Sequence, residues 1–213
     1  MEKLDLRKQL SHLYQPSTKQ VSLVDVPAMQ FIMADGAIEP GQSPGSSPSF
    51  QEATQALYSL AYTLKFMVKQ RKTEPIDFGV MALEGLWWIE SGEFNIRNPG
   101  NWLWTLMIMQ PDFISEGNFQ DALAQIRKKK PQPGLEKLRF GTFHEGLSAQ
   151  LMHIGPYATE PASVDRLHTF MAENGLRDRI GLGGKHHEIY LGDPRRGDPE
   201  KLKTVLRHPV ERI

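Results

Sequence analysis

The sequence predicts an α+β fold made of two modules with the same element order: a strand, a helix and two further strands. Two observations indicate this fold. Apolar residues recur at helical spacing in some segments, for example Leu57, Leu60 and Leu64, and short strand-like runs lie between those segments. The order found in residues 21–133 then repeats in residues 134–213. Runs of strands with helices between them favour an antiparallel sheet that has the helices packed on one side.

The first module opens with an extended segment and a Gly, Pro and Ser-rich loop that is too irregular for a regular element. Ser49 and Glu52 have capping-box spacing, which predicts a helix from Phe50 to about Lys69. The remaining expected elements are strands at 76–89 and 101–110 and a helix at 117–130, which Pro131 ends.

The second module repeats this plan with two strands in 138–155, a helix at 159–174, a strand from His186 and a last strand at 202–210. "FIMADGAI" corresponds to "QLMHIGPY", and "VMALEGLWW" to "KHHEIYLGD". Two modules related by a pseudo-twofold axis would leave a central ligand cleft between them. We therefore expect residues 21–213 to form a single domain and residues 1–20 to be an N-terminal lead-in.

Composition excludes several classes of function. Lys plus Arg and Asp plus Glu both number 25, so no net charge attracts nucleic acid or an anionic membrane. Cysteine is absent, in agreement with a reducing cytoplasm. The N-terminus has no signal peptide, and no stretch approaches the roughly 18 apolar residues of a membrane span. We expect a cytoplasmic protein that binds neither nucleic acid nor membrane directly.

The segment "HHEIYLGDP" (186–194) is a strand with a carboxylate in its middle. Alternation places His186, Glu188 and Tyr190 on one face. An edge strand with a wet face explains Glu188 from periodicity alone, and a place in a ligand cleft is the alternative. Glu84 falls at a similar place in the first module, so we expect both carboxylates to face one cleft, although Glu84 could instead pair with a nearby Arg or Lys.

The segments "QLMHIGPYATEPASVDRLHTFMAENGL", "HHEIYLGDPRRGDPEKLKTVLRHPV" and "ALEGLWW" together resemble the GyrI-like small-molecule-binding domain, over roughly residues 20 to 212. The resemblance implies two strand-helix-strand-strand modules around a central cleft. In drug-sensing regulators this domain binds bulky aromatic, often cationic compounds. The strand glutamate that matches Glu188 supplies the negative charge there.

Two features differ from those regulators. Only about 20 residues precede the domain, too few for a helix-turn-helix. Trp-Trp after the first-module Glu-Gly, together with Tyr58, is similar to a free-standing bacterial branch. Some members of that branch hydrolyse cyclopropane-containing aromatic compounds that alkylate DNA.

Hydrolysis of such a strained ring needs a planar apolar slot, a donor to the conjugated carbonyl and a carboxylate that orients water. Glu188 is the candidate for the carboxylate, and Tyr58 or Tyr157 for the donor. A neighbouring Glu84 would raise the pKa of one carboxyl group of the pair, which suits acid–base chemistry.

Aromatic residues supply the expected ligand-binding surface. Even spacing puts Trp88 on the face of Glu84 as a stacking platform, and puts Trp87 in the core. Tyr62 follows Tyr58 by one helical turn and is partly a core residue and partly a candidate cleft wall. Tyr190 and His153 complete the expected ligand-binding set.

No metal or other cofactor is expected. His186 and His187 face apart on a strand, and the other histidines show no ligand spacing. Three functions remain open: a hydrolase of planar aromatic xenobiotics, which we favour, a module that sequesters or senses such compounds, and a protein-binding modulator of DNA gyrase. The sequence indicates no oligomeric state.

Overall fold

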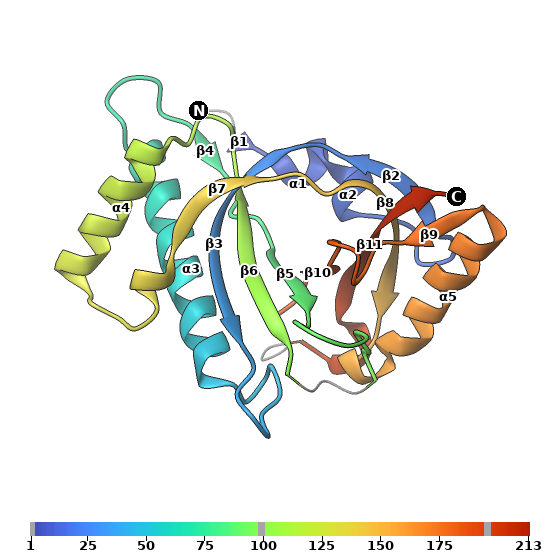
Figure 1. The fold of residues 1–213 in the computed structure, drawn as a ribbon. Helices are drawn as coiled ribbons and strands as arrows, with labels where there is room; N and C mark the ends of the chain where they lie inside the picture. Colours follow the sequence, from blue (N-terminus) through green and yellow to red (C-terminus); the bar gives the residue numbers. More distant parts are fainter. Residues whose placement is uncertain (1–2, 98–100, 194–196) are drawn as a thin grey trace.

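A nine-stranded antiparallel sheet forms the centre of the molecule (Figure 1). The structure is a computed structural model and describes residues 3–97, 101–193 and 197–213. In sheet order the strands are β2 (Ser22–Val26), β8 (Gly146–Ile154), β11 (Lys203–Arg212), β10 (His186–Tyr190), β5 (Leu83–Trp88), β6 (Leu103–Gln110), β3 (Met29–Ala37) and β7 (Arg139–Phe143). The short β9 (Leu176–Asp178) pairs with β11. The α+β prediction is confirmed.

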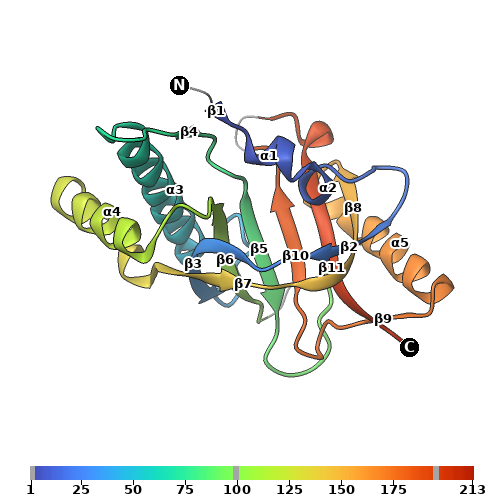
Figure 2. The ribbon, with the colours of Figure 1, turned by 90° about the horizontal axis from the view of Figure 1, so that it is seen from above.

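The two modules are visible in the strand order. The sequence β8-β11-β10 on one side of the sheet mirrors β3-β6-β5 on the other, and the halves meet where β10 pairs with β5. The first module carries α3 (Pro48–Lys69) and the second carries α5 (Glu160–Glu173). These helices flank the two central strands in Figures 1 and 2. This arrangement agrees with the predicted pseudo-twofold repeat.

Further elements surround this frame. The helix α4 (Glu116–Lys129) packs on the outer side of α3. A two-stranded parallel sheet joins β1 (Lys3–Leu4) to β4 (Asp77–Phe78). Short 3-10 helices are η1 (Leu135–Lys137), η2 (Tyr157–Thr159) and η3 (Pro199–Lys201). The N-terminal lead-in contains α1 (Leu6–Gln9) and α2 (Ser11–Tyr14), which its polar composition did not predict.

Helix starts are set by local chemistry that the sequence pattern located only approximately. The N-cap of α3 is Ser47, whose side chain accepts a hydrogen bond from the backbone N–H of Phe50, and Pro48 occupies the first turn. The expected capping box of Ser49 and Glu52 is therefore wrong. The Ser47 hydroxyl and the Ser49 backbone N–H donate to the two carboxylate oxygens of Glu39, while the Ser49 hydroxyl donates to the Ala37 carbonyl.

Strand register divides the central side chains between two faces. His186 lies opposite Trp87, Glu188 opposite Gly85, and Ile189 opposite Glu84. We call the face that carries Trp87, His186, Glu188 and Tyr190 the helix face. The other, which carries Glu84, Trp88, His187 and Arg207, is the N-terminal face.

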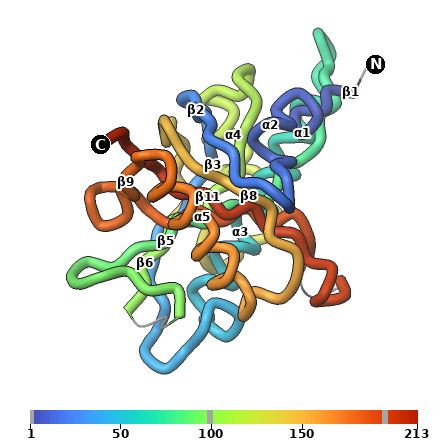
Figure 3. The backbone as a smooth tube through the Cα atoms, turned by 90° about the vertical axis from the view of Figure 1, so that its right-hand side faces the viewer, coloured from blue at the N-terminus to red at the C-terminus, as the bar shows by residue number. Residues whose placement is uncertain are grey.

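The helices α3 and α5 cover the helix face. Phe50 of α3 stacks on Trp87, with ring centroids 5.6 Å apart, and Ser163 of α5 hydrogen-bonds to His153 on β8. The end-on view places α5 in front of β8 and β11 (Figure 3). The N-terminal face is covered by α2, where Tyr14 contacts Glu84.

The strand β10 is central and not an edge. Its residues from His186 to Ile189 are buried, because β5 and β11 pair along its two sides and other elements cover both faces. The edge-strand explanation of Glu188 is therefore wrong, and a buried carboxylate needs partners. Within the described residues no helix is long and apolar enough to cross a membrane.

Candidate functional site

Glu188 lies in the middle of the helix face, where the two modules join. Its side chain is almost fully buried, with 6% of the residue exposed. The carboxylate is hydrogen-bonded by the Tyr190 hydroxyl, and Nε2 of His186 lies 3.0 Å from Oε1. Nε1 of Trp87 donates to the Tyr190 hydroxyl at 3.1 Å, so the Tyr190 proton is directed to Glu188. Fixed donors thus hold this carboxylate in one orientation.

Gly85 makes this arrangement possible. It lies directly opposite Glu188 in the neighbouring strand. A Cβ atom at Gly85 would stand 2.9 Å from both Nε1 of Trp87 and the hydroxyl of Tyr190, closer than such contacts allow. The Glu-Gly of the first module therefore contributes a glycine that leaves room for the Trp87–Tyr190 hydrogen bond.

A second carboxyl group, Glu160, stands beside Glu188. It begins α5 and is buried, with 2% of the residue exposed. It hydrogen-bonds with Thr204, and its Oε1 has no hydrogen-bond partner among the described residues. Burial, and next the charge of Glu188, raise the pKa of Glu160 far above its ordinary value, so it is a neutral acid at pH 7.

Glu188 therefore has a second carboxyl group beside it, but this group is Glu160 and not the expected Glu84. Sequence inspection missed Glu160 because a glutamate in the first turn of a helix is ordinarily explained by the helix dipole. The signal that could have found it is the correspondence of the two modules. That correspondence predicts that the start of α5 lies over the central strands.

Tyrosines from both flanking elements reach this region. Tyr157 of η2 is 39% exposed, and its ring contacts that of Tyr190 edge-on at 5.9 Å. Burial, then the charges of Glu188 and Glu160, raise the pKa of the Tyr157 hydroxyl, and Tyr58 of α3 adds to the effect. Tyr157 thus lies near the two carboxyl groups, and the half-buried Tyr58 lies close enough to Tyr157 to affect its pKa.

Tyr62 and His153 are further members of the predicted ligand-binding set. Tyr62, one turn after Tyr58 on α3, is 49% exposed. His153 is buried on β8, and its Nδ1 lies 2.9 Å from the Ser163 hydroxyl. Burial lowers the pKa of His153, although Glu188 opposes this effect. His153 also lines a cavity of about 350 Å³ along α5, beside Thr159 and Ser163.

Glu84 and Trp88 are not on the face of Glu188, so the prediction that they share its cleft is wrong. Gly85, and not Glu84, lies opposite Glu188, and one residue of offset turns a side chain to the other face. Trp88 does share the face of Glu84, as even spacing required. On that face the Lys185 ammonium lies over the Trp88 ring, 3.3 Å from the ring centroid, in a cation–π contact. Trp87, expected in the core, is buried on the helix face.

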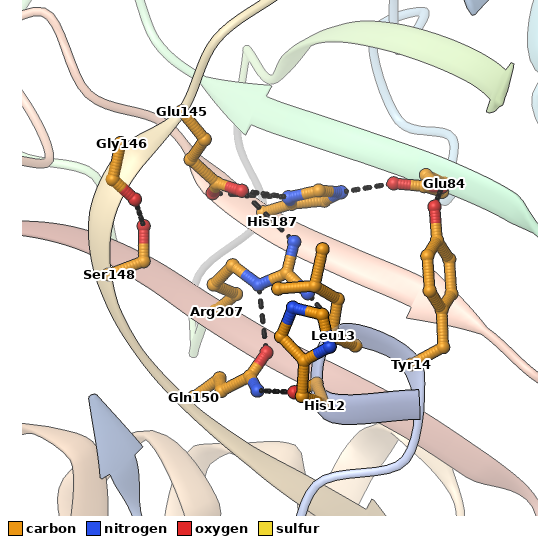
Figure 4. Close-up of polar contacts among 10 residues, drawn as sticks. All are labelled: His12, Leu13, Tyr14, Glu84, Glu145, Gly146, Ser148, Gln150, His187 and Arg207. Atoms are coloured by element: carbon orange, nitrogen blue, oxygen red, sulfur yellow. Dashed lines mark hydrogen bonds and ion pairs between the residues drawn. The ribbon is translucent and has the colours of Figure 1, made fainter. Parts of the chain in front are cut away.

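Glu84 instead belongs to a buried polar network on the N-terminal face (Figure 4). Tyr14 donates to its Oε1 at 2.6 Å, and Nε2 of His187 lies 3.0 Å from its Oε2. Nδ1 of His187 contacts Glu145, which also accepts from Arg207 at 3.1 Å. The alternative of an Arg or Lys partner for Glu84 is also wrong, because its hydrogen-bond partners are a tyrosine and a histidine.

This network balances its own charge and holds the N-terminal segment on the sheet. Burial alone would lower the pKa of His187, but Glu145 and Glu84 raise it to about 9. Burial would raise the pKa of Glu145, but His187 and Arg207 hold it at about 2. Two cations therefore face two carboxylates. Arg207 also donates to the Leu13 carbonyl at 2.6 Å, which assigns the network a structural role.

One group of side chains on the outer side of the helix face has donors close enough to surround a metal ion: His168, Asp178 and His208. The Nδ1 of His208 lies 2.7 Å from Oδ2 of Asp178, a hydrogen-bond distance. Two ligands of a tetrahedral zinc ion stand further apart, at about 3.3 Å for bonds of the usual length. We therefore assign these atoms to hydrogen bonds.

A family model describes nearly the whole chain. The model of the GyrI-like small molecule binding domain matches residues 19–211. The chain belongs to the GyrI-like family. This GyrI-like domain includes every residue around Glu188 and Glu160, whereas α1 and α2 precede it. Among curated proteins, none matches the chain.

Solved structures similar to this GyrI-like chain include two from Listeria innocua. An uncharacterized conserved protein is 40% identical, with a TM-score of 0.87 over 98% of this chain and 100% of its own. A hydrolase is 38% identical, with a TM-score of 0.82 over the same shares. The EcmrR C-terminal domain shares only the fold, at 13% identity and a TM-score of 0.54 over 91% of this chain and 98% of its own.

Proposed function

We propose that this GyrI-like domain binds a planar aromatic compound over Glu188, between α3 and α5, and opens a cyclopropane ring in it by adding water. One observation carries the proposal. The carboxylate of Glu188, held by Tyr190 and His186, stands beside the neutral acid Glu160, whose Oε1 has no hydrogen-bond partner among the described residues. Two carboxyl groups in different protonation states are suited to base and acid roles in one reaction.

In this mechanism Glu188 removes a proton from water as the water oxygen attacks a ring carbon. One carbon–carbon bond of the strained ring breaks, and its electron pair moves into the conjugated carbonyl. The carbonyl oxygen then takes a proton from Glu160 or from a tyrosine hydroxyl, Tyr157 or Tyr58. Atoms balance as substrate plus one water, and the net effect on the protein is a proton moved from the donor to Glu188.

Aromatic residues of the helix face support a planar substrate. Tyr157 and Tyr190 meet edge-on, and Trp87 fixes the Tyr190 hydroxyl, so an apolar wall stands beside the reacting groups. Tyr62 extends this wall along the exposed side of α3. The hydrolase from Listeria innocua, which covers nearly the whole chain, supports an enzymatic role.

A binder without turnover is the second candidate. It is favoured by the buried charge of Glu188, which could serve as the counter-charge of an aromatic cation.

Mass spectrometry separates the two candidates. The purified protein is incubated with a cyclopropane-bearing aromatic alkylator in ¹⁸O-labelled water. A hydrolase yields a ring-opened product that carries one ¹⁸O atom, faster than buffer alone. A product that forms at the rate of buffer, with the compound bound, would leave only the binding function.

A further inference from the structure

A continuous line of side chains connects Glu188 to the protein surface. Nε2 of His186 lies 3.0 Å from Glu188, and Nδ1 of His186 lies 2.7 Å from Nε2 of His208. Nδ1 of His208 lies 2.7 Å from Oδ2 of Asp178, and His168 contacts the same oxygen at 3.3 Å. Both central histidines are buried, whereas 23% of the Asp178 side chain and 54% of that of His168 are exposed. Neither His208 nor Asp178 has a part in the mechanism above.

The hydrogen bonds of this line fix its proton count. Three contacts join Glu188, His186, His208 and Asp178, and each contact needs one proton. Two neutral imidazoles supply two protons, and two ionised carboxylates supply none. The three hydrogen bonds therefore need a third proton, in addition to the two that the neutral imidazoles supply.

The position of the third proton can be found by starting from Asp178, at the surface end of the line. Burial would raise the pKa of Asp178, but hydrogen bonds from His168 and His208 hold it well below its ordinary value, so Asp178 is ionised. His208 must then donate from Nδ1. Burial lowers the pKa of His208 to about 4, so it stays neutral and accepts at Nε2 from His186. The third proton consequently lies between His186 and Glu188.

Ordinary acidities place that proton on the imidazole, because a carboxylic acid is a stronger acid than an imidazolium. The surroundings agree. Tyr190 stabilises the Glu188 carboxylate by a hydrogen bond, and the ring of Phe94 stacks on His186 at 5.4 Å, where it can stabilise a cation.

Other ionisable groups face this line from three sides. Glu160, Tyr157 and His153 face Glu188 from α5, η2 and β8, and their pKa values are coupled to its charge. At the outer end the exposed pair of Arg97 and Asp165 lies near His168. Glu160 is neutral, so the carboxylates that act on His186 are Glu188 directly and Asp178 through His208.

We propose that Asp178 and His208 are positioning residues that hold His186 as a buried imidazolium, and that this cation keeps Glu188 ionised. The arrangement resembles the carboxylate–imidazole pair of hydrolytic triads, extended by one imidazole. The protonation pattern rests on the three hydrogen bonds and on the ionised state of Asp178, and it needs no substrate. Its use in turnover, where an ionised Glu188 serves as the base, rests on the proposed function.

Nitrogen-15 NMR of the labelled histidines tests the pattern without any ligand. Signals are assigned by their loss in His186→Gln and His208→Gln, and EDTA is present throughout. At pH 7 the wild-type protein should show His186 protonated on both nitrogens and His208 protonated on Nδ1 alone. A neutral His186, or a His208 protonated on Nε2 alone, would overturn the proposal.

Asp178→Asn provides the perturbation. An amide can donate to Nδ1 of His208, which lets the two outer hydrogen bonds reverse, so that His208 donates from Nε2 to Nδ1 of His186. The hydrogen bond from Nε2 of His186 to Glu188 keeps its direction, and the third proton is no longer needed. His186 should then become neutral with its proton on Nε2. Asp165→Asn is the matched control, because it removes an exposed carboxylate near His168 outside the line, and it should change neither histidine. An Asp178→Asn protein whose His186 keeps both protons would contradict the proposal, and the wild-type spectrum decides the matter if this variant does not fold.

The pH profile of turnover gives a second readout. Without the neighbouring cation, Glu188 is harder to ionise, so the acid limb of the profile should move to higher pH by about one unit or more in Asp178→Asn. It should stay in place in Asp165→Asn. An unmoved limb in Asp178→Asn would refute the role in turnover. A wild-type protein with no turnover would refute the hydrolase while the NMR spectra still decide the protonation pattern.

Discussion

Replacing Glu160 by Gln should remove a pH-dependent cost of folding. In the unfolded chain this carboxyl ionises near its ordinary pKa of 4.5, whereas in the folded protein burial and Glu188 raise its pKa far above that value. The folded state therefore binds one proton more than the unfolded state as the pH rises above 4.5. Stability that is fully present below that pH is lost progressively above it, until the folded carboxyl also ionises.

The magnitude follows from the linkage relation. Each pH unit in this window costs about 1.4 kcal/mol of unfolding free energy if Glu160 stays fully protonated in the folded state. Between pH 5 and pH 8 the upper bound is about 4 kcal/mol. Glu160→Gln keeps the shape and hydrogen-bonding capacity of the neutral acid but has no proton to take up. The advantage of the variant over the wild type should therefore grow with pH.

Urea unfolding at pH 5, 6, 7 and 8 measures this difference. Glu173→Gln, at the exposed end of the same helix, is the matched control and should follow the wild-type curve. Parallel curves for Glu160→Gln and wild type would refute the assignment of Glu160 as a buried neutral acid.

Three further predictions concern the two faces of the sheet. In fluorescence titrations, Trp88→Ala should change the affinity for a planar aromatic ligand less than about twofold. Trp87→Phe loses the N–H that orients Tyr190 and should weaken the affinity about three- to tenfold, near the 1 kcal/mol of one hydrogen bond. Equal effects of the two substitutions would contradict the assignment of faces. Gly85→Ala should push Trp87 and Tyr190 apart and lower the unfolding free energy by about 1–3 kcal/mol in urea titrations; an unchanged stability would show that the site has more room than the structure gives it. The network on the N-terminal face should lose its stabilisation as pH rises from 6.5 through about 9, because folding raises the pKa of His187 and the folded protein then gives up that proton. His187→Gln should flatten the unfolding free energy across this window, and a slope equal to that of wild type would rule out His187 as its source.

Much of the fold could be predicted from the sequence because local patterns carry it. The helical spacing of Leu57, Leu60 and Leu64 predicted a buried helix face, and the alternation in 186–190 predicted a strand. The observed helix and strand agree, although the strand is buried on both faces. The order of elements in the two modules also follows from these patterns. The short helices α1 and α2 could not be predicted, because four-residue helices have no period and their contacts lie on distant strands.

The site was predicted less completely because it depends on register between strands far apart in the sequence. Glu188 and Tyr190 share a strand, so alternation was sufficient to group them. Whether Glu84 joins them depends on one residue of offset between β5 and β10, and no local pattern fixes that offset. The line from His186 to Asp178 likewise draws on three elements, so the spacing of histidines in the sequence does not reveal it.

Turnover by Glu188→Gln tests the central claim most directly. The variant keeps the shape of the side chain and its hydrogen bond from Tyr190 but cannot take a proton from water. With a cyclopropane-bearing aromatic alkylator, the rate of the water-added product should fall about 10²- to 10⁴-fold, the usual contribution of a positioned acid–base group. Binding of a neutral alkylator should change little, because stacking carries it. A folded Glu188→Gln protein that forms the product at the wild-type rate would contradict the account.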